Sequence, residues 1–439
     1  MSVGLGVVEG FYGRPWSFGA RKRIVRLLGD VGLDTYGYAP KSDPLHRARW
    51  WEPLGVDQLR AFEELASVAR DAGVRIVYGI APERLFGGRA NLKPGSTLGD
   101  ARFEQLVARC VSLVARGIAS FMLLFDDTWP TVVPRFASSR IGERHAAVAS
   151  ALVERLRAVD PSASVTVVPA IYSGRASALS AGARAYLHGL ATKGDFSLAW
   201  TGPRIFSPYI TAREVEAFAK AAGRAVWIWN NAIANDWLPL ATGEALGLAG
   251  RCRLCFGPVA NLAHGAIDAS SGVLLNGARE PVVTEVALTA WAEQVRAPTP
   301  AGRDADAALS RALDRTFGNA GALVAQLAEQ VRGHPIAAAH VRGARPIQEI
   351  ALRARAGIPG ARSALESALV ELATLESRLR GALGGHPGWE DLEGTAAKVA
   401  LVSKALLAKL RNDPDAKRLL KETTAHRWST SLDELLHDL

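Results

Sequence analysis

Cysteine is scarce in this sequence, which contains three in 439 residues. Three cysteines are too few for a disulfide framework, so the composition fits a reducing compartment. Cys252 and Cys255 form one Cys-x-x-Cys pair, but no second pair follows at zinc spacing, and a structural zinc site needs four ligands. The sequence therefore predicts neither a disulfide-stabilised scaffold nor a structural zinc site.

Long apolar stretches are also absent. No run approaches the roughly 20 apolar residues that cross a bilayer, so we predict no membrane partner. The first residues show no basic start followed by an apolar segment and a small-residue cleavage site, and Val3–Val8 already has the pattern of a strand. We therefore expect a cytoplasmic protein.

Charge of one sign is not clustered, although the formal net charge is +9 and the isoelectric point is near 9.7. Arginines are spread along helical patterns, without a long basic run and without a basic–aromatic nucleic-acid motif. Solvated helix faces account for such a distribution. We predict no nucleic-acid partner.

Short β-rich runs alternate with amphipathic helical patterns over roughly the first two thirds of the chain, and alternation of this kind predicts a parallel sheet. The predicted strands are Val3–Val8, Leu33–Tyr38, Arg75–Ile80, Ser120–Phe125, Ser164–Val168, Phe196–Trp200, Ala225–Trp229 and Gly272–Leu275. The predicted helices include Ala20–Val31, Val56–Asp71, Arg102–Ala115, Glu143–Val159, Ala212–Ala222 and Pro239–Leu248. Such a series suits an α/β fold of the closed (β/α)8 type, the TIM barrel.

An open doubly wound sheet is the alternative fold for the same pattern. It would normally carry a glycine-rich phosphate-binding turn between a strand and a helix. Gly4, Gly6 and Gly10 have the wrong spacing for that turn and belong to the first strand region. The barrel is therefore the predicted fold.

Pro298-Thr299-Pro300 interrupts the pattern and predicts a domain boundary. We expect a catalytic barrel over residues 1–297 and a small α-helical bundle over residues 298–439. The helices predicted for the bundle are Asp304–Phe317, Ala320–Val331, Ile347–Ala356, Gly360–Leu383 and Leu392–Arg411.

Asp126 and Asp127 directly follow the apolar run Phe121–Phe125, which has the composition of a buried strand. Adjacent carboxylates repel each other, and a proton held by one of them gives a site both an acid and a base. An Asp-Asp turn or a helix N-cap is the structural alternative. Barrel active sites form at the C-terminal ends of strands, which favours the functional reading.

Aromatic and polar residues gather at the other predicted strand ends. They include Trp16, Lys41, Tyr172, Trp200, Asn230, Asn231 and Asn276. Aromatic faces together with hydrogen-bonding groups suit a sugar, which presents C–H faces and hydroxyl edges. The pattern predicts a carbohydrate pocket at the barrel mouth.

Five segments resemble the family 84 glycoside hydrolases, the O-GlcNAcase-type β-N-acetylglucosaminidases. They are GVVEGFYGRPW at Gly6–Trp16, YAPK at Tyr38–Lys41, LLFDD at Leu123–Asp127, WTGP at Trp200–Pro203 and WNNAIAND at Trp229–Asp236. They occur in the same order as in that family, and the first is long and specific. The helical region after the barrel is also similar in kind.

The resemblance implies a retaining, substrate-assisted mechanism that needs no metal and no organic cofactor. The acetamido oxygen of the sugar attacks its own anomeric carbon and gives an oxazoline. Asp126 matches the residue that binds the acetamido N–H and stabilises the developing positive charge. Asp127 matches the general acid that later becomes the base. The implied partner is a glycan or glycoconjugate that contains N-acetylglucosamine; the oligomeric state is not predicted.

The resemblance also assigns substrate contacts. Gly10 and Lys41 match residues that bind sugar hydroxyls. Tyr172 and Trp229 match aromatic residues around the acetamido group and the reaction centre. Asn231 matches an amide near the acetamido group, and Asp236 matches the carboxylate that binds the far hydroxyls of the ring. Packing at the barrel rim is the structural alternative for the two aromatics, and helix capping is the alternative for Asn231 and Asp236. We assign Glu9 and Tyr12 to structural support and Asn230, Asn235 and Asn276 to loop bracing.

One position departs from the family pattern. Where the family commonly has Asn-Pro-Asn, this chain has Asn276-Gly277-Ala278, so a contact to the outer hydroxyls of the sugar is expected to be missing. We expect weaker discrimination between gluco and galacto epimers, or room for a substituent.

Three other functions compete with this prediction. A carbohydrate-binding barrel without turnover would have no reason to keep the acidic pair. A metal-dependent barrel hydrolase lacks support because the sequence has no His-Glu-x-x-His motif. A β-N-acetylhexosaminidase or hyaluronidase-like enzyme with altered sugar preference stays open.

Overall fold

The computed structural model describes residues 3–82, 85, 101–126, 139–236, 253–297, 304–332, 346–426 and 428–438. The chain divides into two compact units. The first consists of Met1–Ala232 and Asn261–Arg279, and the second consists of Ile233–Ala260 and Glu280–Leu439. The predicted domain boundary after Ala297 stays a prediction, and α8 (Pro281–Arg296) groups with the second unit.

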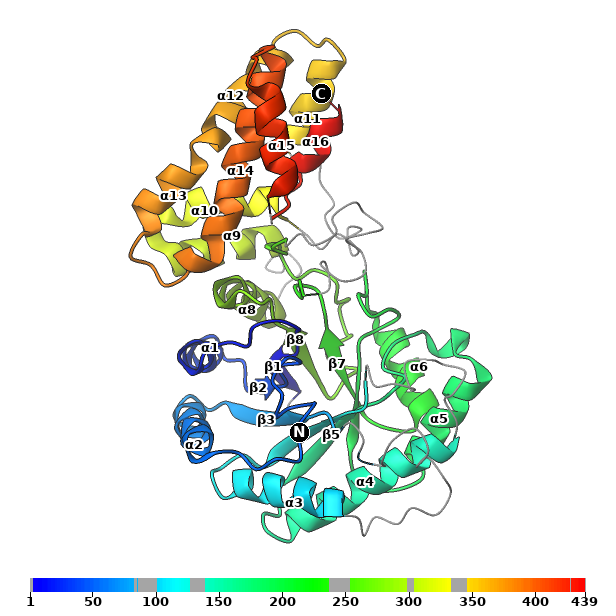
Figure 1. Cartoon of the computed structure of the whole chain (residues 1–439). Coiled ribbons are helices and arrows are strands. Elements are labelled where there is room, and N and C mark those ends of the chain that lie inside the picture. Colours follow the sequence, from blue (N-terminus) through cyan, green and yellow to red (C-terminus); the bar gives the residue numbers. More distant parts are fainter. Residues whose placement is uncertain are drawn as a thin grey trace. The chain divides into compact units, whose positions relative to one another are not determined.

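The first unit is built on a closed barrel of parallel strands in sequence order, with β1 paired to both β2 and β8 (Figure 1). The strands are β1 Gly4–Glu9, β2 Thr35–Tyr38, β3 Arg75–Ile80, β4 Ser120–Leu124, β5 Ser164–Val168, β6 Ser197–Trp200, β7 Val226–Asn230 and β8 Gly272–Asn276. The predicted (β/α)8 barrel is confirmed. Every predicted strand is present, with ends shifted by at most two residues.

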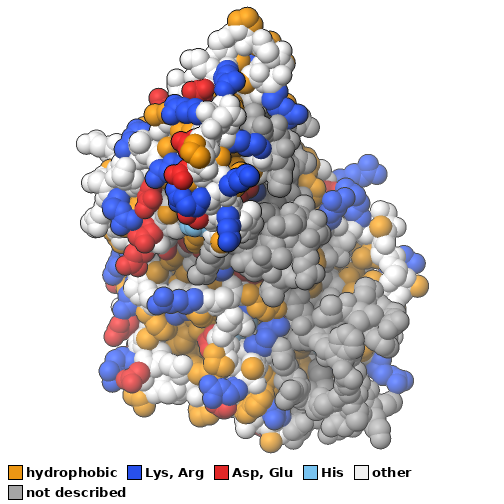
Figure 2. All heavy atoms as spheres, turned by 45° about the horizontal axis from the view of Figure 1, so that its top comes forward, with side chains coloured by type: hydrophobic (Ala, Val, Ile, Leu, Met, Phe, Trp, Pro, Cys, Tyr) orange, Lys and Arg blue, Asp and Glu red, His pale blue; other side chains and the backbone are white. Residues whose placement is uncertain are grey.

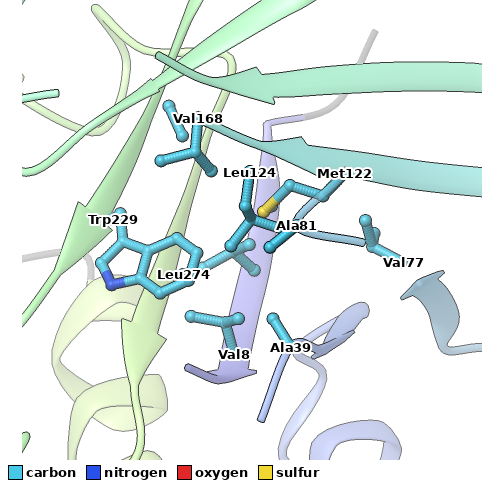
Figure 3. Packing of buried hydrophobic residues seen from close by; sticks show 10 residues of the cluster. Val8, Ala39, Val77, Ala81, Met122, Leu124, Val168, Trp229 and Leu274 are labelled. Atoms are coloured by element: carbon cyan, nitrogen blue, oxygen red, sulfur yellow. The ribbon is translucent and has the colours of Figure 1, made fainter. Parts of the chain in front are cut away.

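Apolar side chains fill the inside of the barrel, which explains why the strands read as near-continuous apolar runs. The interior cluster consists of Val8, Ala39, Val77, Ala81, Met122, Leu124, Val168, Ala199, Trp229 and Leu274 (Figure 3). Tyr172 packs against this cluster. The barrel is therefore a packed core, and polar chemistry is confined to its ends.

Amphipathic helices follow the strands. In the first unit they are α1 Phe18–Val31, α2 Val56–Asp71, α3 Ala101–Val114, α4 Ser139–Arg157, α5 Ala181–Ala191 and α6 Ala212–Ala222. Ser17 caps the first turn of α1, and Thr211 forms a capping box with Glu214 at the start of α6. Helix α5 was not predicted, and the predicted helix Pro239–Leu248 lies outside the described residues.

The second unit contains α8 and the helices of the C-terminal region. These are α9 Ala305–Phe317, α10 Gly321–Gln330, α11 Pro346–Arg355, α12 Ala361–Ala373, α13 Leu375–Leu383, α14 Trp389–Leu410, α15 Ala416–Ala425 and α16 Leu432–Asp438. The helix predicted over Gly360–Leu383 is two helices. It breaks at Thr374, whose hydroxyl donates to the Glu371 carbonyl at 2.9 Å and competes with the regular helix bonds.

No helix in the described ranges is both long enough and apolar enough to cross a membrane. On the face seen in Figure 2, basic and acidic side chains are interspersed, with hydrophobic side chains between them. Mixed charge of this kind is ordinary for a protein surface.

Candidate active site

Six of the eight residues that the resemblance assigns to the site lie at strand ends of the barrel. Gly10 follows β1, Lys41 follows β2, Asp126 follows β4, Tyr172 follows β5, and Trp229 and Asn231 lie at the end of β7. Because the strands are parallel and the barrel is closed, these ends meet at one mouth. Asp127 lies outside the described residues, and Asp236 belongs to the second unit.

Asp126 lies between two cations. It is 6% exposed, its Oδ2 contacts the Lys41 ammonium, and Nη2 of Arg47 lies 4.0 Å from its Oδ1. At that distance the guanidinium attracts the carboxylate without a hydrogen bond. Among the described residues, Oδ1 has no hydrogen-bond partner. Buried polar atoms are normally paired, so this oxygen indicates a place for a donor from a ligand.

Local contacts hold Lys41 and Arg47 in place. The Lys41 N–H donates to the Phe11 carbonyl at 3.1 Å, and His46 Nδ1 lies 2.9 Å from the Gly79 carbonyl at the end of β3. Burial, reinforced by the charge of Lys41, lowers the pKa of His46 to about 3, so the imidazole is neutral. Since a carbonyl only accepts, Nδ1 carries the proton. This bond anchors the turn that carries Arg47.

Trp229 forms an apolar wall beside the charged group. Its ring belongs to the interior cluster (Figure 3), and Lys41 Nζ lies 5.7 Å from its ring centroid. A Cβ atom at Gly10 would lie 2.1 Å from Cζ2 of this ring, too close for any side chain. Glycine at position 10 therefore allows the indole to lie against the backbone after β1.

Hydrogen bonds join the ends of three strands through two amides. The Gly10 N–H donates to Asn276 Oδ1 at 3.0 Å, and Asn276 Nδ2 donates to Asn231 Oδ1 at 2.9 Å. The same Asn231 oxygen accepts from Trp229 Nε1 at 3.0 Å, and Asn231 Nδ2 donates to the Ile205 carbonyl at 2.8 Å. The predicted binding residues Gly10, Trp229 and Asn231 are thus parts of one connected group.

Tyr172 is carried by a fixed stretch of backbone. Its carbonyl accepts from the Thr201 N–H at 2.8 Å and from the Thr201 hydroxyl at 3.2 Å, which ties the end of β5 to the end of β6. Two residues earlier, the Ala170 N–H donates to the Tyr186 hydroxyl at 2.9 Å. The ring is partly buried, as expected for a residue at the rim.

Glu9 is a buried support for the loop after β1. Its carboxylate accepts from Arg21 Nε and Nη2 at 2.8 and 2.9 Å, from Tyr36 Oη at 2.7 Å, and from the Trp16 N–H at 2.9 Å. Burial and the Glu9 charge raise the pKa of Tyr36. Four donors compensate the buried charge, so these contacts match the structural role predicted for Glu9.

Asp236 is half-buried and lies in the second unit. The residue before it, Asn235, is fully buried, and its Nδ2 donates to Glu280 Oε2 at 2.6 Å and to the Arg253 carbonyl at 3.2 Å. These bonds fix the backbone that leads into Asp236. The predicted contact of Asp236 with the sugar stays a prediction.

The structure corrects the expectation for Ala278. This residue is fully buried, so no solvent-accessible space faces its methyl group. Its carbonyl accepts from Trp16 Nε1 at 3.2 Å, which ties the β8 end to the loop after β1. Room for a sugar substituent at this position is therefore wrong.

Arg47 was not predicted as a site residue. It lies outside the matched motifs, and its place in the loop after β2, six residues beyond Lys41, was the only sequence signal. Within the described ranges, no group of three or more His, Cys, Asp or Glu side chains is placed to hold a metal ion.

A family model described as beta-N-acetylglucosaminidase matches residues 5–329, well over half of the chain. The chain belongs to this family. The β-N-acetylglucosaminidase family consists of glycoside hydrolases, and its match covers all the strand ends described above. The predicted resemblance is thereby confirmed.

The curated relatives of this family member include "Protein O-GlcNAcase" of Rattus norvegicus and of Mus musculus. Each is 32% identical over 276 residues, which cover 62% of this chain. The chain spans 27% of the length of either relative.

Solved structures agree with the fold. A structure titled CpGH84B has a TM-score of 0.78 and 20% identity, covering 99% of this chain and 76% of that one. A mutant of the Thermobaculum terrenum O-GlcNAc hydrolase has a TM-score of 0.79 and 19% identity, covering 98% and 91%. At these identities the likeness concerns the fold alone.

Proposed function

We propose that this protein is a retaining β-N-acetylglucosaminidase that removes terminal β-linked N-acetylglucosamine from glycoconjugates by substrate-assisted catalysis. The observation that carries the proposal is the set of contacts that the Asp126 carboxylate makes. Its carboxylate has two cationic neighbours, yet Oδ1 accepts no hydrogen bond from the described residues. A buried acceptor with a negative charge suits an acetamido N–H that becomes more acidic as positive charge develops.

In the proposed first step, the acetamido oxygen attacks the anomeric carbon and the bond to the leaving oxygen breaks. The leaving oxygen takes a proton from Asp127, and Asp126 accepts the acetamido N–H bond and stabilises the charged oxazoline. In the second step, Asp127 takes a proton from water, which attacks the anomeric carbon and reopens the ring. Two displacements at one carbon retain its configuration.

The residues around Asp126 also suit a bound sugar ring that carries an acetamido group. Trp229 offers an apolar face next to the charged pair of Lys41 and Asp126, as a sugar ring with an acetamido methyl requires. The backbone at Gly10 comes close to this face because it carries no side chain. The names of the rat and mouse relatives support an N-acetylglucosamine-bearing protein as the natural substrate class.

Aryl β-glycosides test the proposal directly. The wild-type protein should hydrolyse the N-acetylglucosaminide and release the β-anomer first, as proton NMR can show. The matching glucoside lacks the internal nucleophile and should be turned over at least about 1,000-fold more slowly, given the size of effective molarities. Binding of N-acetylglucosamine without turnover would instead support a carbohydrate-binding barrel and refute the enzyme.

A further inference from the structure

The amide chain at the barrel mouth has a fixed polarity. The Gly10 N–H and the Trp229 indole N–H can only donate, so Asn276 and Asn231 must each turn Oδ1 toward them. The Ile205 carbonyl can only accept, so Asn231 must turn Nδ2 toward it. Exchanging Oδ1 and Nδ2 of either amide would place two donors or two acceptors against each other.

Asn276 adds the bond that completes this arrangement. Its Nδ2 donates to Asn231 Oδ1 at 2.9 Å, so this oxygen receives two donors, one from Asn276 and one from Trp229. Both acceptor positions of Asn231 are thereby filled. Its Nδ2 has two protons and gives one to Ile205. The second Nδ2 proton is what Asn231 can offer to a bound molecule.

Burial makes the arrangement rigid. Asn276 and Asn231 are 5% and 7% exposed. Asn276 is part of β8 and lies beside Val8 of β1 in the register of the barrel, and the Gly277 N–H continues the ladder to the Val8 carbonyl at 2.9 Å. The backbone of Asn276 is therefore fixed by the strand pairing of the barrel and cannot move separately from the sheet.

We propose that Asn276 is a positioning residue that acts through Asn231. It locks the Asn231 amide so that only a hydrogen-bond donor faces the bound sugar, and the sugar must therefore present an acceptor oxygen there. This inference rests on the proposed function only in taking a sugar as the ligand.

The isosteric variant Asn276→Asp tests this role. A carboxylate oxygen still accepts from Gly10, but the second oxygen replaces the donor and faces Asn231 Oδ1. We expect kcat/KM for an aryl N-acetylglucosaminide to fall about 10- to 100-fold at pH 8, the range of a lost buried hydrogen bond. An unchanged kcat/KM would overturn the proposal.

The same variant has a pH signature that a purely structural defect lacks. When the carboxyl group introduced by Asn276→Asp is protonated, it has one oxygen that accepts and one hydroxyl that donates, as the amide does. The groups that contact this side chain, the Gly10 N–H and the Asn231 amide, with Trp229 behind them, do not titrate; the charged groups near this wall are Lys41 and Asp126. The ratio of variant to wild-type kcat/KM should therefore rise toward 1 as pH falls. A ratio independent of pH would contradict the role.

A double-mutant cycle shows whether Asn276 acts through Asn231. In an Asn231→Ala background, Asn276→Asp should cost less than about threefold, because the shared bond is already lost. Asn261→Asp is the matched control, since Asn261 is also a buried amide and bonds to Asn230, not to Asn231. Its effect should multiply with that of Asn231→Ala. Fully multiplicative losses for Asn276→Asp would overturn the proposal.

One measurement is independent of turnover. In protein labelled with 15N-asparagine, the Asn231 side-chain resonances are identified by their loss in Asn231→Ala. They should shift in Asn276→Asp and stay in place in Asn261→Asp. If the wild type fails to hydrolyse any glycoside, the proposed function falls, while these shifts still decide the role of Asn276.

Discussion

At the scale of single residues, the two oxygens of Asp126 have different neighbours, and this difference defines the site. Oδ2 contacts Lys41, while Oδ1 has Arg47 at 4.0 Å and no hydrogen-bond partner among the described residues. The two cations attract the carboxylate, and Arg47 lies too far from Oδ1 to form a hydrogen bond with it. The role proposed for Asp126, which is to accept a hydrogen bond where positive charge develops, depends on these two features.

Asp126→Asn should remove the advantage of the acetamido group. The neutral amide has the same shape but loses the charge that stabilises the oxazoline. We expect kcat/KM for the aryl N-acetylglucosaminide to fall about 100- to 1,000-fold, as for removal of an electrostatic stabiliser. A thiazoline mimic of the intermediate should bind this variant poorly. Inhibition equal to that of the wild type would remove Asp126 from the mechanism.

Asp127→Asn should show its effect through the leaving group. A dinitrophenolate leaves without a proton, whereas an alkyl oxygen needs one from the acid. We expect a loss of about 100- to 10,000-fold for alkyl N-acetylglucosaminides, the usual contribution of a general acid, and a much smaller loss for the dinitrophenyl one. Equal losses on both substrates would contradict the role given to Asp127.

Ala278→Asn should destabilise the protein. Ala278 is fully buried, so a larger polar side chain must displace its neighbours and lose its own hydration. We expect a loss of about 1–3 kcal/mol in the free energy of unfolding. Ala278→Ser is the smaller matched change and should cost less. A variant as stable as the wild type, with sharper discrimination between gluco and galacto substrates, would restore the original expectation.

The sequence predicted which residues belong to the candidate site but not which contacts they make. The pair Asp126-Asp127 was recognisable because an apolar run precedes it, and the motifs pointed to Lys41 and Trp229. Arg47 was missed because it meets Asp126 only when the turn after β2 is held against β3. The filled space at Ala278 was missed because burial arises from the tertiary structure.

At the scale of secondary-structure elements, two buried histidines hold segments beside the site. His46 connects the turn after β2 to β3, and His145 of α4 stacks on Phe125 with ring centroids 3.8 Å apart. The Tyr186 hydroxyl accepts from the Ala170 N–H and forms a second hydrogen bond, 2.8 Å long, with His145 Nδ1. Burial lowers the pKa of both histidines to about 3.

These histidines predict a loss of stability in mild acid. In the unfolded chain a histidine titrates near its ordinary pKa of about 6.5, so between roughly pH 6.5 and 3 the unfolded state binds more protons than the folded state. The free energy of unfolding therefore falls as pH falls through this window. Each histidine should contribute on the order of 2 kcal/mol between pH 6.5 and 4.5.

Urea unfolding of His145→Gln measures this contribution. Glutamine can accept from Tyr186 but does not titrate, so the variant should lose part of the acid sensitivity between pH 7 and pH 4.5. His188→Gln changes an exposed histidine on α5 and should keep the wild-type pH dependence. The same slope in all three proteins would contradict a buried neutral His145.

The accuracy of the element predictions followed the strength of the apolar pattern. Strands buried on both faces were placed to within two residues, because short apolar runs that alternate with amphipathic helices are typical of a parallel sheet. The helix α5 was missed since its alanine-rich stretch has a weak contrast between faces. The break at Thr374, where the hydroxyl donates to the Glu371 carbonyl, is not encoded by any periodicity.

At the scale of the whole molecule, each of the two compact units is made of two separate stretches of the chain. The second unit includes α8, which directly follows the barrel strands in sequence. Within that unit α8 contacts α9 and α14, and its first turn is capped from α14, where Asp391 Oδ2 accepts from the Val282 N–H at 3.0 Å. The proline-containing segment after Ala297 is a boundary in sequence, while the helix before it packs with the helices beyond it.

A chain ending at Ala297 tests whether the boundary predicted from the sequence separates two parts that fold independently. Eleven of the 16 residues of α8 are buried, too many for a helix with one covered face. Removing α9 and α14 would expose part of this apolar surface and leave the Val282 N–H uncapped. We expect the shortened chain to unfold at least about 10 °C below the full chain, because several kcal/mol of burial are lost. Asp391→Ala in the full chain removes only the cap and should cost about 1 kcal/mol. A shortened chain with the melting temperature and activity of the full protein would show that the predicted boundary separates independent domains.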